Sequence, residues 1–136
     1  GLGQIRRYDG ILSRRREIID RYNKGLAGLP VTMLTHYTPD RMSSGHLYVI
    51  NLNGKDTEQR NKFIERMAEL GVATNVHYKP LPMHTGYQKL GFKIEDYPNA
   101  YEQFKNVVTL PLHTCLSDED VDYVVGCARE CLLQLS

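Results

Sequence analysis

Apolar side chains recur every three or four positions through the first 26 residues, which is the spacing of one face of a helix. This stripe consists of Leu2, Ile5, Tyr8, Leu12, Ile19, Tyr22 and Leu26. Charged residues occupy most of the remaining positions, and Gly25, Gly28 and Pro30 supply stop signals. We therefore predict a long connecting helix over residues 1–27, with a single apolar face that needs a partner surface.

Short runs of β-branched and aromatic residues follow, separated by glycine, proline and asparagine. These runs predict strands at residues 31–34, 46–52, 72–78 and 107–110. Helical spacing predicts a helix from Asp56 or Thr57 to Leu70, a short one around residues 99–105, and a last one that Ser117 would cap. Prolines and glycines make residues 79–98 irregular.

The order of these elements predicts an α/β fold, more closely an α+β sandwich. We expect a three- to four-stranded sheet, mostly antiparallel or mixed, with helices packed on one face. The strand, helix and strand over residues 46–78 form the pattern of a crossover unit. A chain of 136 residues fits a single domain. Within 1–136, residues 1–27 are the connecting helix and 28–136 the small α/β domain.

Composition narrows the classes of function. Hydrophobic residues make up 41% and charged residues 24% of the chain, as in globular proteins, and the net charge is +1. A near-neutral chain is a poor general binder of nucleic acid, and no apolar run is long enough to predict a membrane span. Three cysteines do not form a disulfide framework, so we expect a cytoplasmic location. The first residue is Gly1, which suggests a processed chain or a fragment.

No phosphate-binding glycine loop and no zinc motif stands out in the sequence. Cys127 and Cys131 lie four positions apart, and burial in the core explains this spacing better than metal binding does. The run Arg14-Arg15-Arg16 could contact phosphates, but the interleaved Glu17 and Asp20 favour a solvated helix face. A self-contained nucleotide-dependent or zinc-dependent enzyme is therefore disfavoured.

Among the five histidines, His77 has the most informative position. It ends a predicted strand and precedes a proline-rich segment, and sites tend to form where strands feed long loops. The residues alone leave a structural and a functional role open for His77. His36 and His46 flank a loop and are expected at the surface or at a strand edge. Lys79 could form a Schiff base, although a lone lysine in such a loop usually lies in water.

The ordered set of motifs resembles one enzyme family over essentially the whole chain. The set includes Gly1-Leu-Gly-Gln-Ile5, Ser44-Gly-His-Leu-Tyr48, Gly71-Val-Ala-Thr74, His77-Tyr-Lys-Pro-Leu81 and Leu116-Ser-Asp-Glu-Asp120. Together these segments look like the C-terminal part of the DegT/StrS-type sugar aminotransferases, which are pyridoxal-phosphate enzymes of fold type I. His77-Tyr78 before Pro-Leu is the strongest single element.

The resemblance implies that the chain is the small domain of a longer enzyme. Family members carry the cofactor lysine and the cofactor pocket in a larger N-terminal domain. It follows that this chain holds no catalytic, cofactor-binding or metal-ligating residue of its own, and Lys79 does not match the Schiff-base position. His77 matches the histidine that approaches the sugar-nucleotide substrate, and Tyr78 is its weaker neighbour. Both are therefore candidate substrate-binding residues.

The implied parent reaction is the transfer of an amino group from glutamate to a nucleotide-linked ketosugar, by a homodimer that contains pyridoxal 5'-phosphate. The small domain would close one wall of the cleft, and this chain alone would be inactive. A standalone α/β interaction or regulatory module remains the alternative. RNA binding through a ferredoxin-like sheet is disfavoured by the neutral charge and by the lack of an aromatic RNA-binding motif.

Overall fold

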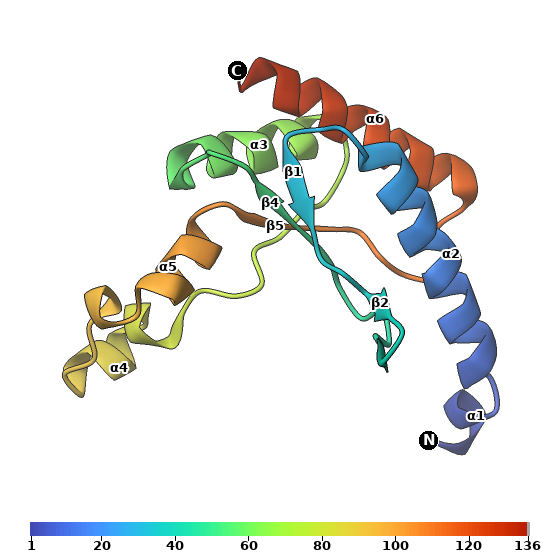
Figure 1. Cartoon of the computed structure of the whole chain (residues 1–136), viewed down its shortest axis with the longest axis horizontal. Helices are drawn as coiled ribbons and strands as arrows, with labels where there is room; N and C mark the ends of the chain where they lie inside the picture. Colours follow the sequence, from blue (N-terminus) through green and yellow to red (C-terminus); the bar gives the residue numbers. More distant parts are fainter. Residues whose placement is uncertain (136) are drawn as a thin grey trace.

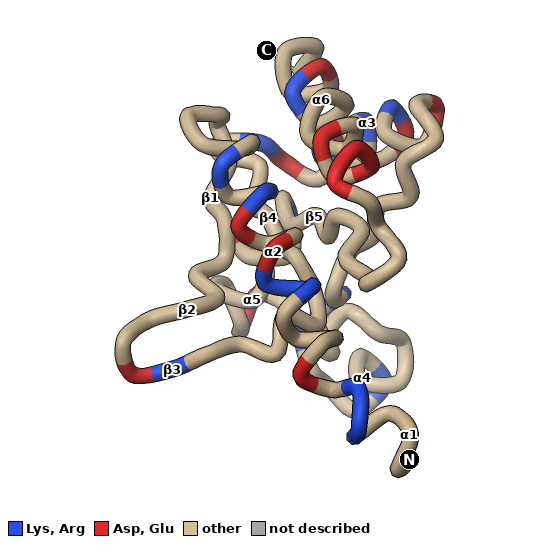
Figure 2. Tube along the Cα trace, turned by 90° about the vertical axis from the view of Figure 1, so that its right-hand side faces the viewer, with Lys and Arg blue, Asp and Glu red and all other residues tan. Residues whose placement is uncertain are grey.

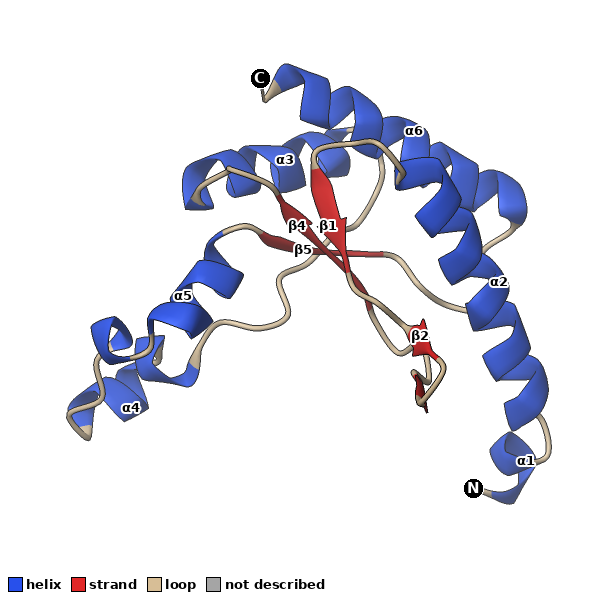
Figure 3. Cartoon of the chain, in the orientation of Figure 1, coloured by secondary structure: helices blue, strands red, loops and turns tan. Residues whose placement is uncertain are grey.

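Three helices pack on one face of a three-stranded antiparallel sheet in the computed structural model, which describes residues 1–135 (Figure 1). The sheet has the order β1-β4-β5 and consists of β1 (Val31–Met33), β4 (Tyr48–Leu52) and β5 (Val107–Leu110). The helices are α2 (Tyr8–Leu26), α3 (Thr57–Glu69) and α6 (Asp118–Gln134) (Figure 3). The predicted α/β class, with helices on one face of the sheet, is confirmed.

The two faces of the sheet differ in what covers them. In β4 the side chains of Tyr48, Ile50 and Leu52 are buried, whereas Val49 and Asn51 between them are only half-buried. This alternation is the period of two that a strand imposes, and it directs the buried set toward the helices. The opposite side of the sheet, called the open face below, carries Val49, Asn51 and their cross-strand partners.

The core fills the space between the sheet and the three helices. Its fully buried larger side chains are Tyr22, Tyr48, Phe63, Ile18, Ile19, Leu26, Ile50, Leu52, Met67, Leu110 and Val108. The helical spacing of the sequence predicts a stripe on α6 of Val121, Val124, Val125, Ala128, Leu132 and Leu135, and the first five are buried while Leu135 is partly buried. On α2 the predicted Ile19, Tyr22 and Leu26 are buried, whereas Tyr8 is exposed and the buried Ile18 was not predicted.

Local signals define the ends of two helices. Asp56 and Ser117 each form a capping box: the side chain of the capping residue accepts a hydrogen bond from the third helical amide, and the third side chain accepts one from the backbone amide of the capping residue. Helix α3 ends before Gly71, whose φ of 76° favours glycine. Both N-caps agree with the sequence prediction.

The N-terminal helix is not continuous, so the prediction of one long helix over residues 1–27 was wrong in this respect. A short helix α1 (Leu2–Ile5) is separated from α2 by Arg6 and Arg7. Leu2 is 65% exposed and Ile5 71%, and no residue of α1 is buried. Most helical stability in proteins comes from packing an apolar face, and no part of residues 1–135 buries the face of α1. The buried part of the stripe begins at Ile19.

The strand predicted at residues 72–78 is also wrong. This segment forms a single antiparallel bridge, between Asn75 and Thr109 of β5. The backbone bends at His77, so the pairing stops after one residue. Because β5 is antiparallel to both, the segment still runs parallel to β4, as the predicted crossover unit requires.

Two smaller parts project from the sheet. A hairpin of β2 (Tyr37–Thr38) and β3 (Arg41–Met42) follows β1. An arm, defined as residues 81–105, contains η1 (Leu81–Met83), α4 (Thr85–Lys89), η2 (Ile94–Asp96) and α5 (Pro98–Lys105) (Figure 1). Within residues 1–135, no helix has both the length and the apolar character needed to cross a lipid bilayer.

The position of His36 corrects the expectation of a surface or strand-edge residue. Its side chain is only 4% exposed, and its ring stacks on Tyr48 with 5.7 Å between centroids. Nδ1 lies 3.2 Å from the hydroxyl of Ser43, and Nε2 is buried without a partner. Burial therefore lowers the pKa of His36, because the charged ring would lose its hydration. His46 is exposed as expected.

This environment predicts a loss of stability in mild acid. The unfolded chain binds a proton at His36 below about pH 6.5, while the folded chain resists it, so stability falls as the pH drops toward the lower folded pKa. One such site contributes at most about 1.4 kcal/mol per pH unit. We expect the melting temperature of the native chain to fall more between pH 7.5 and pH 5.5 than that of His36→Phe, which keeps the stacked ring. Equal falls would contradict this account.

Candidate functional site

His77 lies where the chain leaves the sheet, and two neighbours hold its ring. Nδ1 lies 2.9 Å from Oγ1 of Thr109, and the ring meets Tyr78 edge-on with 4.6 Å between centroids. The peptide bond that joins His77 to Tyr78 is cis. His77 is half-buried, whereas Tyr78 is 69% exposed. The His77 ring is thus held against the sheet, while the Tyr78 ring is exposed to solvent.

The strand register identifies the face of the sheet on which this pair lies. Thr109 pairs with Val49 of β4, whose side chain points away from the helices. Cross-strand partners share a face, so Thr109 belongs to the open face, and the His77 ring that contacts it lies there too. The structure therefore places the two predicted site residues on the side of the sheet that α2, α3 and α6 leave uncovered.

A hollow of about 640 Å³ occupies another part of the open face. Its lining includes Thr32 of β1, Asn51 of β4, Arg41 of the hairpin and Gln103 of α5. Asn51 and Gln103 hydrogen-bond to each other at 3.1 Å, from Nε2 of the glutamine to Oδ1 of the asparagine. His77 does not line this hollow. The open face thus has a hollow of its own, and His77 lies outside it.

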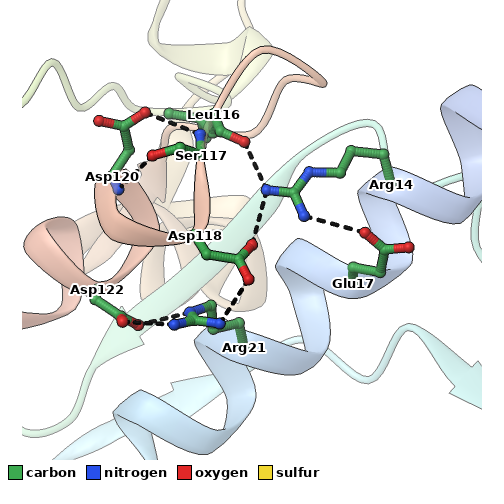
Figure 4. Close-up of polar contacts among 8 residues, drawn as sticks. All are labelled: Arg14, Glu17, Arg21, Leu116, Ser117, Asp118, Asp120 and Asp122. Carbon is green, nitrogen blue, oxygen red and sulfur yellow. Dashed lines mark hydrogen bonds and ion pairs between the residues drawn. The ribbon is translucent and has the colours of Figure 1, made fainter.

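Two arginines of α2, Arg14 and Arg21, form ion pairs and hydrogen bonds within the chain. Arg14 pairs with Glu17 at 3.0 Å and with Asp118 at 2.9 Å, and it donates to the carbonyl of Leu116 (Figure 4). Arg21 bridges to Asp118 at 2.8 Å and to Asp122 at 2.6 Å. Its hydrogen bond lowers the pKa of Asp122.

Charges of both signs alternate along α2 (Figure 2). Because α6 supplies carboxylates to Arg14 and Arg21, these two arginines join helix to helix. Their ion pairs leave neither arginine free to bind phosphate. The sequence favoured a solvated helix face for Arg14-Arg15-Arg16, and Arg14 departs from this because it is half-buried and paired with Asp118 of α6.

The cysteine pair of α6 belongs to the core. Cys127 is 6% exposed and Cys131 1%, as the sequence analysis favoured. Burial raises the pKa of the Cys131 thiol to about 11, which disfavours the reactive thiolate. Among residues 1–135, no group of three or more histidine, cysteine, aspartate or glutamate side chains is arranged to hold a metal ion.

No lysine of the described residues fits the role of a Schiff-base lysine. Such a lysine is typically desolvated, so that its amine is neutral near neutral pH. Lys79 is exposed, Lys62 pairs with Glu58, and Lys55 donates to the carbonyl of Leu135. None of the lysines within residues 1–135 is buried. Residues of this chain therefore do not fit pyridoxal phosphate as a covalently held cofactor.

This geometry predicts the behaviour of the isolated chain toward pyridoxal phosphate. Mixing the two and reducing with borohydride is expected to yield no stoichiometric adduct, because exposed lysines form only weak, exchanging imines in water. Mass spectrometry of the reduced chain measures the occupancy. A single lysine labelled to completion at equimolar cofactor would contradict the assignment.

The comparison with known proteins decides the family. Residues 1–129 match the DegT/DnrJ/EryC1/StrS aminotransferase family. The chain belongs to this family. The family match spans both the segment before α2 and most of α6, so it covers the whole helix-and-sheet unit described above.

Two curated proteins are similar in sequence to most of this chain. The spore coat polysaccharide biosynthesis protein SpsC of Bacillus subtilis is 35% identical over 133 residues, which is 96% of this chain and 34% of SpsC. A dTDP-4-dehydro-2,3,6-trideoxy-D-glucose 4-aminotransferase of Saccharopolyspora spinosa is 31% identical over 125 residues, 89% of this chain and 30% of that protein.

A solved structure, the putative sugar aminotransferase Spr1654 of Streptococcus pneumoniae in its PMP-form, superimposes with a TM-score of 0.98 at 46% identity. It covers 100% of this chain, which corresponds to 34% of Spr1654. The chain therefore spans about a third of the length of these relatives.

The sequence of this DegT-family chain did not identify Thr109 and Asn75, which lie next to His77 in the structure. Thr109 lies in the middle of β5 among Val107, Val108 and Leu110, and Asn75 bridges to it through two backbone hydrogen bonds. A polar residue inside an apolar strand is a usable signal, because a buried hydroxyl needs a hydrogen-bond partner. That His77 is the hydrogen-bond partner follows only from the pairing of residue 75 with β5.

Proposed function

We propose that this chain is the C-terminal small domain of a pyridoxal-phosphate-dependent sugar aminotransferase. The full-length enzyme would act as a cytoplasmic homodimer and move an amino group from glutamate to a nucleotide-linked ketosugar in polysaccharide biosynthesis. Residues 1–27 would connect the domains, and residues 28–136 would form the small domain. Membership of the DegT family supports this proposal, as do relatives named for a dTDP-linked sugar and for a polysaccharide.

One observation carries the assignment of the site: His77 and Tyr78 lie together on the open face, with Tyr78 69% exposed. Imidazole can donate or accept a hydrogen bond to a sugar hydroxyl or donate one to a phosphate oxygen. The exposed phenol ring offers an apolar surface and a hydroxyl to the same ligand. These two side chains would bind and orient the sugar nucleotide.

The cofactor supplies the electron sink for amino transfer, and it would be held by the part of the enzyme outside this chain. What this chain adds is one wall of the cleft. A wall that fixes the sugar reduces the orientational freedom lost on the way to the transition state. Substitutions in this wall should therefore affect the sugar more than the amino donor.

The test is His77→Ala in the full-length enzyme. We expect kcat/KM for a dTDP- or UDP-linked 4-ketosugar to fall by about 1–3 kcal/mol, roughly 5- to 150-fold, as for a lost polar contact in a closed site. The half-reaction with glutamate should change less. His46→Ala is the matched control, because His46 is exposed and lies in another part of the chain.

Stopped-flow absorbance of the cofactor separates the two half-reactions. If His77→Ala turned over both substrates like the unmodified enzyme, His77 would be only a residue at the end of the bridged segment. Loss of both half-reactions together with loss of the bound cofactor would indicate damaged folding, and would likewise remove the support for a substrate role.

A further inference from the structure

Thr109 is an unusual residue for its place in the sheet. It lies in β5, it is only 6% exposed, and the other three residues of the strand are apolar. Valine has the same shape and would bury a methyl group there, whereas a buried hydroxyl costs free energy unless it is hydrogen-bonded. Within residues 1–135, the one hydrogen bond of this hydroxyl is to Nδ1 of His77, at 2.9 Å.

The backbone holds this contact in place. The amide of Thr109 donates to the carbonyl of Asn75 at 2.8 Å, and the amide of Asn75 donates back at 3.2 Å. His77 follows two residues after this single bridge, which brings its ring within hydrogen-bond distance of Thr109. Tyr78 packs edge-on against the same ring. The position of the imidazole is therefore set by strand pairing and packing.

An imidazole has two distinct nitrogens, and a hydrogen bond made by one fixes the ring orientation and so determines which nitrogen is left for a ligand. A threonine hydroxyl can donate or accept, so it can hold the ring in either tautomer. Since Thr109 engages Nδ1, the nitrogen left for a ligand is Nε2. We propose that Thr109 is a positioning residue, which fixes the His77 ring so that Nε2 is the atom presented to the sugar-nucleotide substrate. This inference rests on the substrate role proposed for His77.

Two substitutions isolate the hydroxyl. Thr109→Val removes it and keeps the branched shape that suits a strand, while Thr109→Ser keeps it and removes a methyl group. Thr32→Val is the matched control, because Thr32 lies on the open face in β1 and hydrogen-bonds to Asn53. Only Thr109→Val should disturb His77.

The first measurement uses the 136-residue chain and needs no substrate. Nitrogen-15 chemical shifts of the His77 ring report the tautomer and the hydrogen bond at Nδ1. We expect the Nδ1 shift of a hydrogen-bonded nitrogen in the native chain and in Thr109→Ser, and a changed Nδ1 shift in Thr109→Val. A native Nδ1 without the shift of a hydrogen-bonded nitrogen would overturn the proposal without any variant. So would unchanged His77 signals in a folded Thr109→Val chain.

The second measurement uses the full-length enzyme. We expect Thr109→Val to lower kcat/KM for the nucleotide-linked ketosugar by about 3- to 10-fold, the scale of one lost neutral hydrogen bond, with recovery in Thr109→Ser. The glutamate half-reaction should keep its rate, which a general folding defect would not allow.

The outcomes separate the two proposals. If His77→Ala lowers the sugar half-reaction and a folded Thr109→Val does not, the positioning role is wrong and the substrate role stands. If His77→Ala has no effect, the substrate role fails, and the role of Thr109 fails with it. Equal losses in Thr109→Ser and Thr109→Val would show that the hydroxyl is not the determining group.

Discussion

Replacing Ile50 by aspartate is expected to unfold the chain. Ile50 is fully buried in β4, the central strand, where it is paired with Met33 on one side and Val108 on the other. The helices cover this face, so a carboxylate there would lose its hydration. An unpaired buried charge costs several kcal/mol, and a domain has only about 5–15 kcal/mol of net stability.

The control for this substitution is Thr32→Asp, which places the same charge on the exposed side of the neighbouring strand. Circular dichroism during thermal unfolding measures both variants. We expect no cooperative transition for Ile50→Asp and a nearly native one for Thr32→Asp. Similar melting curves for the two variants would mean that the assignment of the two faces of the sheet is wrong.

Truncating Tyr48 to alanine is expected to cost about 3–5 kcal/mol, the usual range for removing a large buried aromatic ring. The ring is fully buried, lies 4.7 Å from the ring of Tyr22 between centroids, and stacks on His36. Its hydroxyl donates to Oδ1 of Asn23 at 2.8 Å. Alanine would leave a cavity between α2, the hairpin and the sheet.

Tyr48→Phe separates the ring from the hydroxyl. It keeps both aromatic contacts and loses only the bond to Asn23, so we expect a cost of about 1 kcal/mol. Urea denaturation of the two variants gives the free energies of unfolding directly. Equal costs would show that the hydroxyl, and not the packing of the ring, is what matters at this position.

Much of the fold followed from local patterns in the sequence. The capping residues Asp56 and Ser117 and the apolar stripe of α6 are signals that act within one or two turns, and the structure contains each of them. The failures occurred where the outcome depends on distant residues. Whether α1 continues into α2 depends on whether its apolar face finds a surface to pack on. Whether residues 72–78 form a strand beside β5 depends on where the backbone bends.

The candidate site divides in the same way. The motif identified His77 and Tyr78, because a strand end before prolines is visible in the sequence. Neither their face of the sheet nor the hydrogen bond to Thr109 could be obtained that way, since both depend on pairing between segments more than thirty residues apart. The burial of His36 was missed for a similar reason: its ring stacks on Tyr48, which lies in β4, whereas His36 lies in the loop after β1.

The arm has a consequence for motion near the site. Its backbone amides from Met83 to Tyr97 donate only to carbonyls between Pro80 and Ile94, and none of residues 81–105 is buried. Residues 83–97 can therefore open without breaking a backbone pair of the sheet, and their amides should exchange with solvent through local opening, well before those of β4 and β5. The arm begins four residues after His77, and its far end in α5 is tied to β4 by the hydrogen bond between Gln103 and Asn51. The middle of the arm is thus expected to open as a local unit while both of its ends stay next to the sheet.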